Sequence, residues 1–188
     1  MQKNRENLKA NVNPSNYKST RINFMECCEQ KNQNEKYKEY ETIRIEKTKN
    51  VCPMCEDYSK KHTSKPVAVM SCEGACLRGE ISRQTANLIC HSLAKEKTVR
   101  ICLGGAFTKD TGQRSLVRNA PKVLALEGCF INCALRMMQG VLPELKPEVV
   151  SVDRLYEFDT KLFGIDEMSQ EEIMKHARTA ADKILSMI

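Results

Sequence analysis

The sequence predicts a three-layer α/β fold, in which a mostly parallel sheet carries helices on both faces, preceded by a disordered N-terminal tail. Two observations indicate this class. Short runs made entirely of apolar residues alternate with segments of helical periodicity, and all-apolar strands are typical of parallel sheets buried on both faces. In addition, 41% of the 188 residues are hydrophobic but only 5% are aromatic, so we expect a core of aliphatic side chains packed in layers.

The first 50 residues form the predicted tail, and residues 51–188 form the predicted domain. The tail is rich in Asn, Lys, Glu and Gln and has no sustained hydrophobic period. It holds 11 Lys and Arg against 7 Asp and Glu, which is most of the net charge of +6. Because the signs are mixed and basic residues do not alternate with aromatic ones, we expect no nucleic-acid binding. Its cysteines, Cys27 and Cys28, are expected to be incidental.

The first half of the domain contains two strand-to-helix units. The apolar run Val67–Met70 predicts a strand, and apolar residues at helical spacing predict a helix over Gly79–Lys95. The run Val99–Cys102 predicts a second strand, followed by a tight turn at Leu103–Gly105 and a polar loop with a short helix over Thr108–Ala120. This alternation is that of a Rossmann-like sheet.

The second half continues the series with two more strands. The runs Val123–Leu126 and Val149–Val152 predict the third and fourth. Between them, Asn132 is the predicted N-cap of a helix over Cys133–Val141. The last helix, Ser169–Ile188, begins with a Ser-x-x-Glu capping box and repeats apolar residues on one face.

The cysteine content points to thiol chemistry rather than to disulfides. The polar start of the chain, Met1–Asn16, predicts no export signal, and no run of about 18 apolar residues predicts a membrane span. We therefore expect a cytoplasmic protein that does not enter membranes. Ten cysteines among reduced thiols indicate metal binding or redox chemistry. No motif identifies a protein partner.

Four cysteines stand where the ends of parallel strands would bring them together. Cys72, Cys102 and Cys129 each stand at the end of a predicted strand, and Cys133 opens the next helix. Parallel strands deliver their carboxyl ends to the same edge of a sheet. Four thiolates form the usual tetrahedral shell of structural zinc, and the neighbouring glycines permit tight turns. The sequence therefore predicts a zinc site at this edge.

A rival pairing of cysteines has the spacing of a zinc ribbon. Cys52 and Cys55 are followed, after 16 residues, by Cys72 and Cys76. The apolar strand between the pairs argues against a ribbon. Cys76 is then a possible additional ligand, and Cys52 and Cys55 are a possible redox pair or further ligands. Cys90, on a predicted apolar helix face, is expected to act as a small core residue.

Other chemistries have weaker support in the sequence. The three histidines have no common spacing, and the chain has neither a phosphate-binding loop nor a dinucleotide fingerprint. Glu73, Glu127 and Arg136 lie near the cysteines and are candidates for orienting ligands or handling protons. Charged loop residues are usually only solvated, so we assign them no catalytic role.

Three segments resemble the DGC domain family, to which zinc binding is ascribed. They are Ser71-Cys-Glu-Gly, Ile101-Cys-Leu-Gly-Gly and Leu126-Glu-Gly-Cys-Phe-Ile-Asn-Cys-Ala134. The resemblance runs from about Val67 to the end of the chain. It implies a cysteine-rich α/β domain whose four ligands are Cys72, Cys102, Cys129 and Cys133. Glu127 replaces the family's Asp, Cys76 is an added thiol, and no reaction is implied.

Three functions therefore remain open at this point. The first is a zinc-binding protein of unknown biological role, with a closed shell of four cysteines. The second is a thiol redox or sulfur-transfer protein with reactive cysteines, which would make the chain an enzyme or a carrier. The third is an iron-sulfur cluster carrier that uses the same four thiolates.

Overall fold

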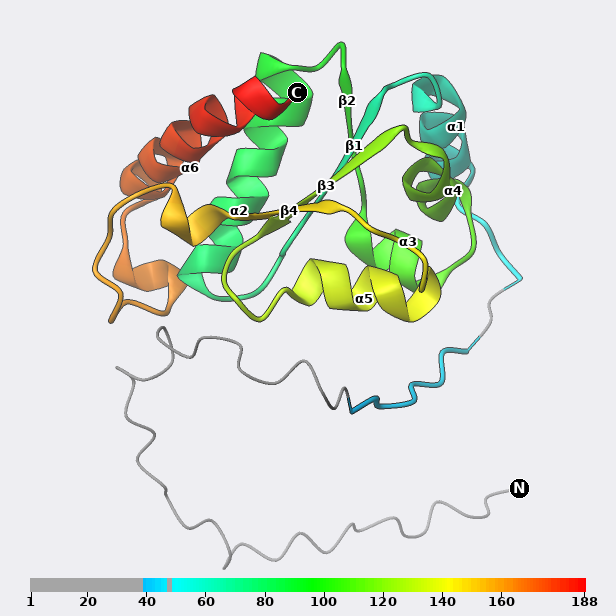
Figure 1. Cartoon of the computed structure of the whole chain (residues 1–188), viewed down its shortest axis with the longest axis horizontal. Helices are drawn as coiled ribbons and strands as arrows, with labels where there is room; N and C mark the ends of the chain where they lie inside the picture. Colours follow the sequence, from blue (N-terminus) through cyan, green and yellow to red (C-terminus); the bar gives the residue numbers. More distant parts are fainter. Residues whose placement is uncertain (1–38, 47–48) are drawn as a thin grey trace, which may run out of the picture. The chain divides into compact units, whose positions relative to one another are not determined.

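The computed structural model describes residues 39–46 and 49–188. Most of the predicted tail, with Cys27 and Cys28, lies outside the described residues, so the domain boundary at residue 50 stays a prediction. The described chain contains one all-parallel sheet with the strand order β2-β1-β3-β4 (Figure 1). Its strands are β1 (Val67–Ser71), β2 (Thr98–Arg100), β3 (Lys122–Glu127) and β4 (Glu148–Ser151). The predicted fold class is confirmed.

Helices cover both faces of this sheet (Figure 1). On one face lie α2 (Leu77–Leu88) and α6 (Gln170–Ile184), with core residues such as Val67 and Val69. On the other lie α3 (Leu103–Thr108), α4 (Gly112–Asn119) and α5 (Cys133–Val141), with Ala68 and Met70. Successive side chains of a strand point to opposite faces. Because both faces are buried, β1 is apolar at nearly every position.

The pairing register brings the strand ends to a common edge. Ser71 at the end of β1 pairs with Leu126 of β3, and Glu127 pairs with Ser151 of β4. The loops that follow these strands therefore begin at the same edge of the sheet. Short 3-10 turns at Val152–Arg154, Ile165–Glu167 and Leu185–Met187 complete the described chain.

Two predicted elements differ from the structure. The predicted tight turn at Leu103–Gly105 is instead the start of helix α3, in which the Ala106 N–H donates to the Cys102 carbonyl at 2.9 Å. Burial of Leu103 and Ala106 against the sheet outweighs the poor helix propensity of two glycines. The helix predicted over Gly79–Lys95 begins earlier, at Leu77, and ends in a π-helical turn over Ile89–Leu93.

Helix α1 (Pro53–His62) was not predicted. It begins with proline at the first position, where a missing N–H costs nothing, and it packs against α4. The Ser59 hydroxyl donates to the Gly112 carbonyl at 2.8 Å, and the Gly112 N–H donates to a Glu56 carboxylate oxygen at 2.9 Å. These long-range contacts attach the Cys52-Cys55 segment to the domain. No periodicity in the sequence predicts them.

Candidate functional site

Four cysteines gather at the carboxyl edge of β1 and β3. Cys72 and Cys76 lie in the loop after β1, Cys129 follows β3, and Cys133 is the first residue of α5. The sulfur atoms of Cys72 and Cys76 lie 3.7 and 3.6 Å from the point that a Cβ on Gly74 would occupy. Burial, followed by the neighbouring thiols of Cys72 and Cys129, raises the pKa of Cys133. The four thiols therefore share one neighbourhood.

Glycines allow the two cysteine loops and the start of α2 to approach closely. A Cβ on Gly128 would stand 2.8 Å from backbone atoms of Arg78. A Cβ on Gly79 would stand 2.8 Å from the backbone of Gly74. Real Cβ atoms do not come so near, so a side chain at either position would push the loops apart. The Glu-Gly-Cys sequence thus needs its glycine for packing.

Hydrogen bonds that involve main-chain groups fix the same loops. The Cys72 N–H and the Ser82 hydroxyl both donate to the Leu126 carbonyl, at 2.8 and 2.7 Å. The Gly79 N–H donates to the Cys76 sulfur at 3.4 Å, which makes Cys76 the N-cap of α2. The Cys76 sulfur therefore lies at the amino end of α2.

Glu127 holds the start of α5, although Asn132 was predicted to do so. Asn132 stands at the N-cap position, but its backbone is left-handed with φ of 55°, and its side chain makes no capping hydrogen bond within the described chain. Instead the fully buried Glu127 carboxylate accepts from the N–H groups of Ala134 and Leu135, at 3.2 and 2.7 Å. Burial raises the pKa of Glu127, against the effect of these two donors. Its role is to position the helix that carries Cys133.

Asp153, which the sequence analysis missed, belongs to the same edge. It lies in the 3-10 turn that follows β4, and its buried Oδ1 atom has no hydrogen-bond partner among the described residues. Burial raises the pKa of Asp153, while Arg78 lowers it. The pKa of Cys129 is raised first by burial and also, to a smaller extent, by Asp153. Its position directly after a predicted strand was the available signal.

Cys102 lies in a different group from the other predicted ligands. It is exposed at the N-cap of α3, and its N–H donates to Gln113 Oε1 at 3.0 Å. The pKa of Cys55 is raised first by a hydrogen bond with the Cys52 thiol, and the thiol of Cys102 raises it further. The backbone N–H of Cys55, followed by its thiol, lowers the pKa of Cys52. Cys90 is buried, as expected, and burial raises its pKa to about 11.

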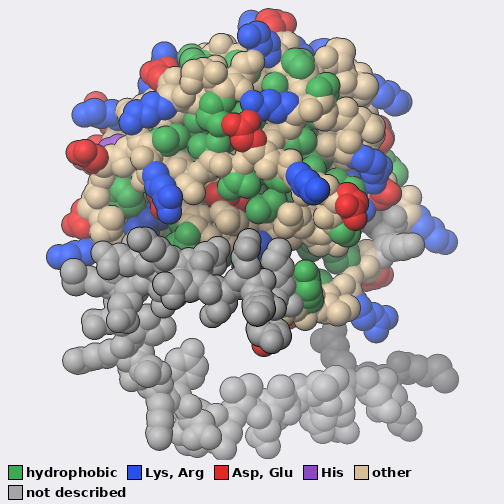
Figure 2. All heavy atoms as spheres, viewed as in Figure 1, with side chains coloured by type: hydrophobic (Ala, Val, Ile, Leu, Met, Phe, Trp, Pro, Cys, Tyr) green, Lys and Arg blue, Asp and Glu red, His purple; other side chains and the backbone are tan. Residues whose placement is uncertain are grey.

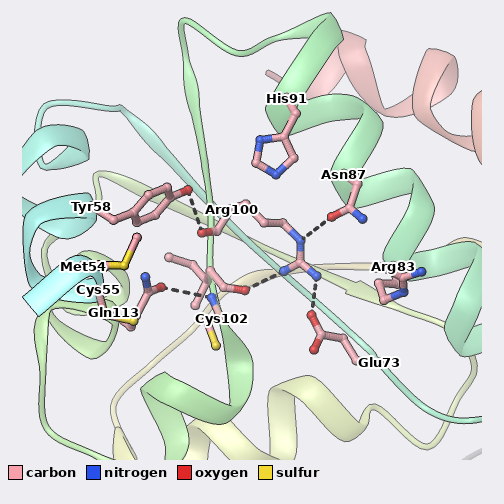
Figure 3. Close-up of a pocket in the computed structure, with 11 residues that line it drawn as sticks. Met54, Cys55, Tyr58, Glu73, Arg83, Asn87, His91, Arg100, Cys102 and Gln113 are labelled. Carbon is pink, nitrogen blue, oxygen red and sulfur yellow. Dashed lines mark hydrogen bonds and ion pairs between the residues drawn. The ribbon is translucent and has the colours of Figure 1, made fainter. Parts of the chain in front are cut away.

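A cavity of about 490 Å³ lies beside Cys55 and Cys102 (Figure 3). Its floor is Arg100, which donates to Asn87 Oδ1 at 3.2 Å and to Ser71 Oγ at 2.7 Å, and which pairs with the Glu73 carboxylate. Glu73 is therefore engaged by an arginine and not aimed at the cysteines of its own loop. On the face seen in Figure 2, positive and negative side chains are interspersed.

The donor set at the β1–β3 edge fits zinc in its chemistry. Thiols are preferred zinc ligands, and an unpartnered buried carboxylate oxygen nearby is the feature expected beside a cation. In residues 39–46 and 49–188, however, no three Cys, His, Asp or Glu side chains already form a metal-binding shell. Binding would therefore require the thiols to turn towards one another.

No helix in the described part of the chain is long and apolar enough to cross a membrane.

Comparison with known proteins identifies one similarity. A family model described as the DGC domain matches residues 68–180, which is more than half of the chain. The match includes both cysteine loops and Cys102, whereas Cys52 and Cys55 precede it. No curated protein and no solved structure matches.

Proposed function

The chain belongs to the DGC domain family, and we propose that it binds a zinc ion through thiolates at the carboxyl edge of its sheet. The observation that carries the proposal is the gathering of Cys72, Cys76, Cys129 and Cys133 from two loops and the start of a helix. Open thiols of this kind persist in a reducing compartment, so a cytoplasmic location is part of the proposal.

The surroundings of these thiols suit a negatively charged metal centre. Four thiolates around Zn²⁺ leave an excess negative charge. Cys76 caps α2, and Cys133 opens α5, so two helix amino ends face that charge. Arg78, whose charge also acts on Asp153, adds a third positive group.

The fourth ligand is either Cys76 or Cys102. The family resemblance implies Cys102, whereas the positions of the sulfur atoms favour Cys76, which flanks Gly74 together with Cys72. We propose Cys76. A closed shell of four sulfurs supplies structural cross-linking and leaves no coordination position for a substrate. In this chain it would tie together the loops after β1 and β3.

Metal analysis of the full chain, purified without air, tests the proposal. We expect about one zinc per chain, lost in Cys129→Ser and in Cys76→Ser but retained in Cys102→Ser. Cys90→Ser is the matched control, because Cys90 is a buried core residue that belongs to neither group of thiols. A brown protein that contains iron would show that the site holds an iron-sulfur cluster and not zinc. Metal lost from Cys102→Ser and kept in Cys76→Ser would restore the family's ligand set.

A further inference from the structure

Cys52 and Cys55 are arranged as a pair at the start of α1. Cys52 is the N-cap residue and Cys55 is the third residue of the helix. A side chain at the N-cap normally faces the N–H of the third helical residue. Cys52 makes no full capping hydrogen bond within the described chain, but its sulfur is near enough to Cys55 for the N–H and then the thiol of Cys55 to lower the pKa of Cys52. This spacing, Cys-x-x-Cys, is that of dithiols that form and break a disulfide.

The two thiols differ in access. Cys52 is exposed and Cys55 is partly buried, so a reagent from solvent meets Cys52 first. The helix that carries them does not stand free of the domain. Its Tyr58 hydroxyl donates to the Arg100 carbonyl at 3.1 Å, in addition to the contacts of Ser59 and Glu56 with Gly112. The pair therefore has a fixed place next to β2.

The cavity of about 490 Å³ opens beside Cys55. This volume falls in the range of small-molecule sites. Figure 3 shows Cys55, Met54 and Cys102 on one side of it and Arg83, Arg100 and His91 around the rest. Its two arginines are each paired with a carboxylate, Arg100 with Glu73 and Arg83 with Glu80 at 2.6 Å. The charges around the cavity are therefore balanced, and its size is what suits a small molecule.

We propose that Cys52 and Cys55 form a second functional site, a dithiol that exchanges with the disulfide of a small thiol. The Cys52 thiolate attacks one sulfur of that disulfide, whose S–S bond breaks, and the first small thiol leaves with a proton. The Cys55 thiolate then attacks Cys52 in the mixed disulfide and releases the second small thiol. The pair is thereby oxidised by two electrons, and one small disulfide is reduced to two thiols.

The test exposes the full chain to oxidised glutathione without air, followed by acid quenching, alkylation of free thiols and mass spectrometry of the peptides. We expect loss of the Cys52 and Cys55 thiols and a peptide that joins them. Cys55→Ser should accumulate glutathione on Cys52, because the second attack is removed. Cys52→Ser should form neither product. Buried Cys90, which should stay reduced, is the internal control.

The proposal is overturned if the native chain keeps both thiols free, or if glutathione modifies Cys102 in preference to Cys52. It is also overturned if the Cys52→Ser, Cys55→Ser chain loses its metal, because the two thiols would then be ligands. Unchanged zinc content and thermal unfolding in both single variants show that folding is intact. Since the pair lies outside the proposed zinc ligands, absence of zinc from the native chain would leave this inference standing.

Discussion

The two groups of cysteines are held in different ways. Around Cys72, Cys76, Cys129 and Cys133, loops approach through glycines, the Leu126 carbonyl accepts two hydrogen bonds, and a fully buried Glu127 fixes the next helix. Around Cys52, Cys55 and Cys102, two of the three thiols are exposed, and Cys55 and Cys102 border an open cavity. The first group is built for holding its thiols in place, and the second for meeting a reagent. Cysteine number and spacing alone do not distinguish these uses.

The glycines of the two groups give the largest expected contrast. Gly128→Ala would bring a methyl group to 2.8 Å from the Arg78 backbone, and we expect a loss of about 2 to 3 kcal/mol in unfolding free energy together with loss of zinc. Gly104→Ala, in α3, is the matched control, because a Cβ there meets no described atom within 4 Å. It should leave stability unchanged or raise it by up to about 1 kcal/mol. Denaturant unfolding with zinc analysis measures both, and equal behaviour of the two variants would refute the packing argument.

Glu127→Gln tests how the first group is supported. The amide keeps one acceptor for the two N–H groups of α5, so we expect a cost of about 1 to 2 kcal/mol near pH 4 in the metal-free chain. Burial raises the pKa of Glu127 above 4.5, so the native chain loses stability as the pH rises through that raised value. The cost of the substitution should therefore be smaller near pH 7, as measured by urea unfolding. A cost that grows with pH would mean that hydrogen bonding outweighs burial.

The thiols themselves should titrate differently in the two groups. The Cys55 N–H and thiol lower the pKa of Cys52 from 9.0, whereas burial raises the pKa of Cys129 and of Cys133 above that value. In the metal-free chain, alkylation of Cys52 should therefore reach half its maximal rate below pH 9.0 and that of Cys133 above it. Rates at single cysteines, followed by mass spectrometry, give both midpoints. The reverse order would remove this distinction between the groups.

Much of the edge that carries the first group was predictable, because all-apolar runs specify buried parallel strands and such strands end together. Cys72, Cys129 and Cys133 follow from that argument alone. The same argument places Asp153 at this edge, but a single acidic residue after a strand does not predict a buried oxygen without a hydrogen-bond partner. The buried cap supplied by Glu127 also depends on tertiary packing, since a local residue, Asn132, occupies the position that sequence rules favour.

The position of Cys102 depends on information that apolar runs do not contain. Such runs do not reveal the strand order, which places β2 at one edge of the sheet and β3 on the other side of β1. Nor did any periodicity predict α1, whose attachment to α4 rests on single contacts such as Ser59 to Gly112. Cys102 therefore lies near Cys55, and its place in the zinc shell stays a prediction.

The separation of the cysteines into two groups is tested most directly by alkylation of the native, metal-bound chain at each cysteine, before and after removal of the metal by a chelator. We predict that bound zinc protects Cys72, Cys76, Cys129 and Cys133, while Cys52, Cys55 and Cys102 react at the same rates with and without it. Protection of Cys102 in place of Cys76, or of Cys52 and Cys55, would contradict the division into a metal centre and a separate dithiol.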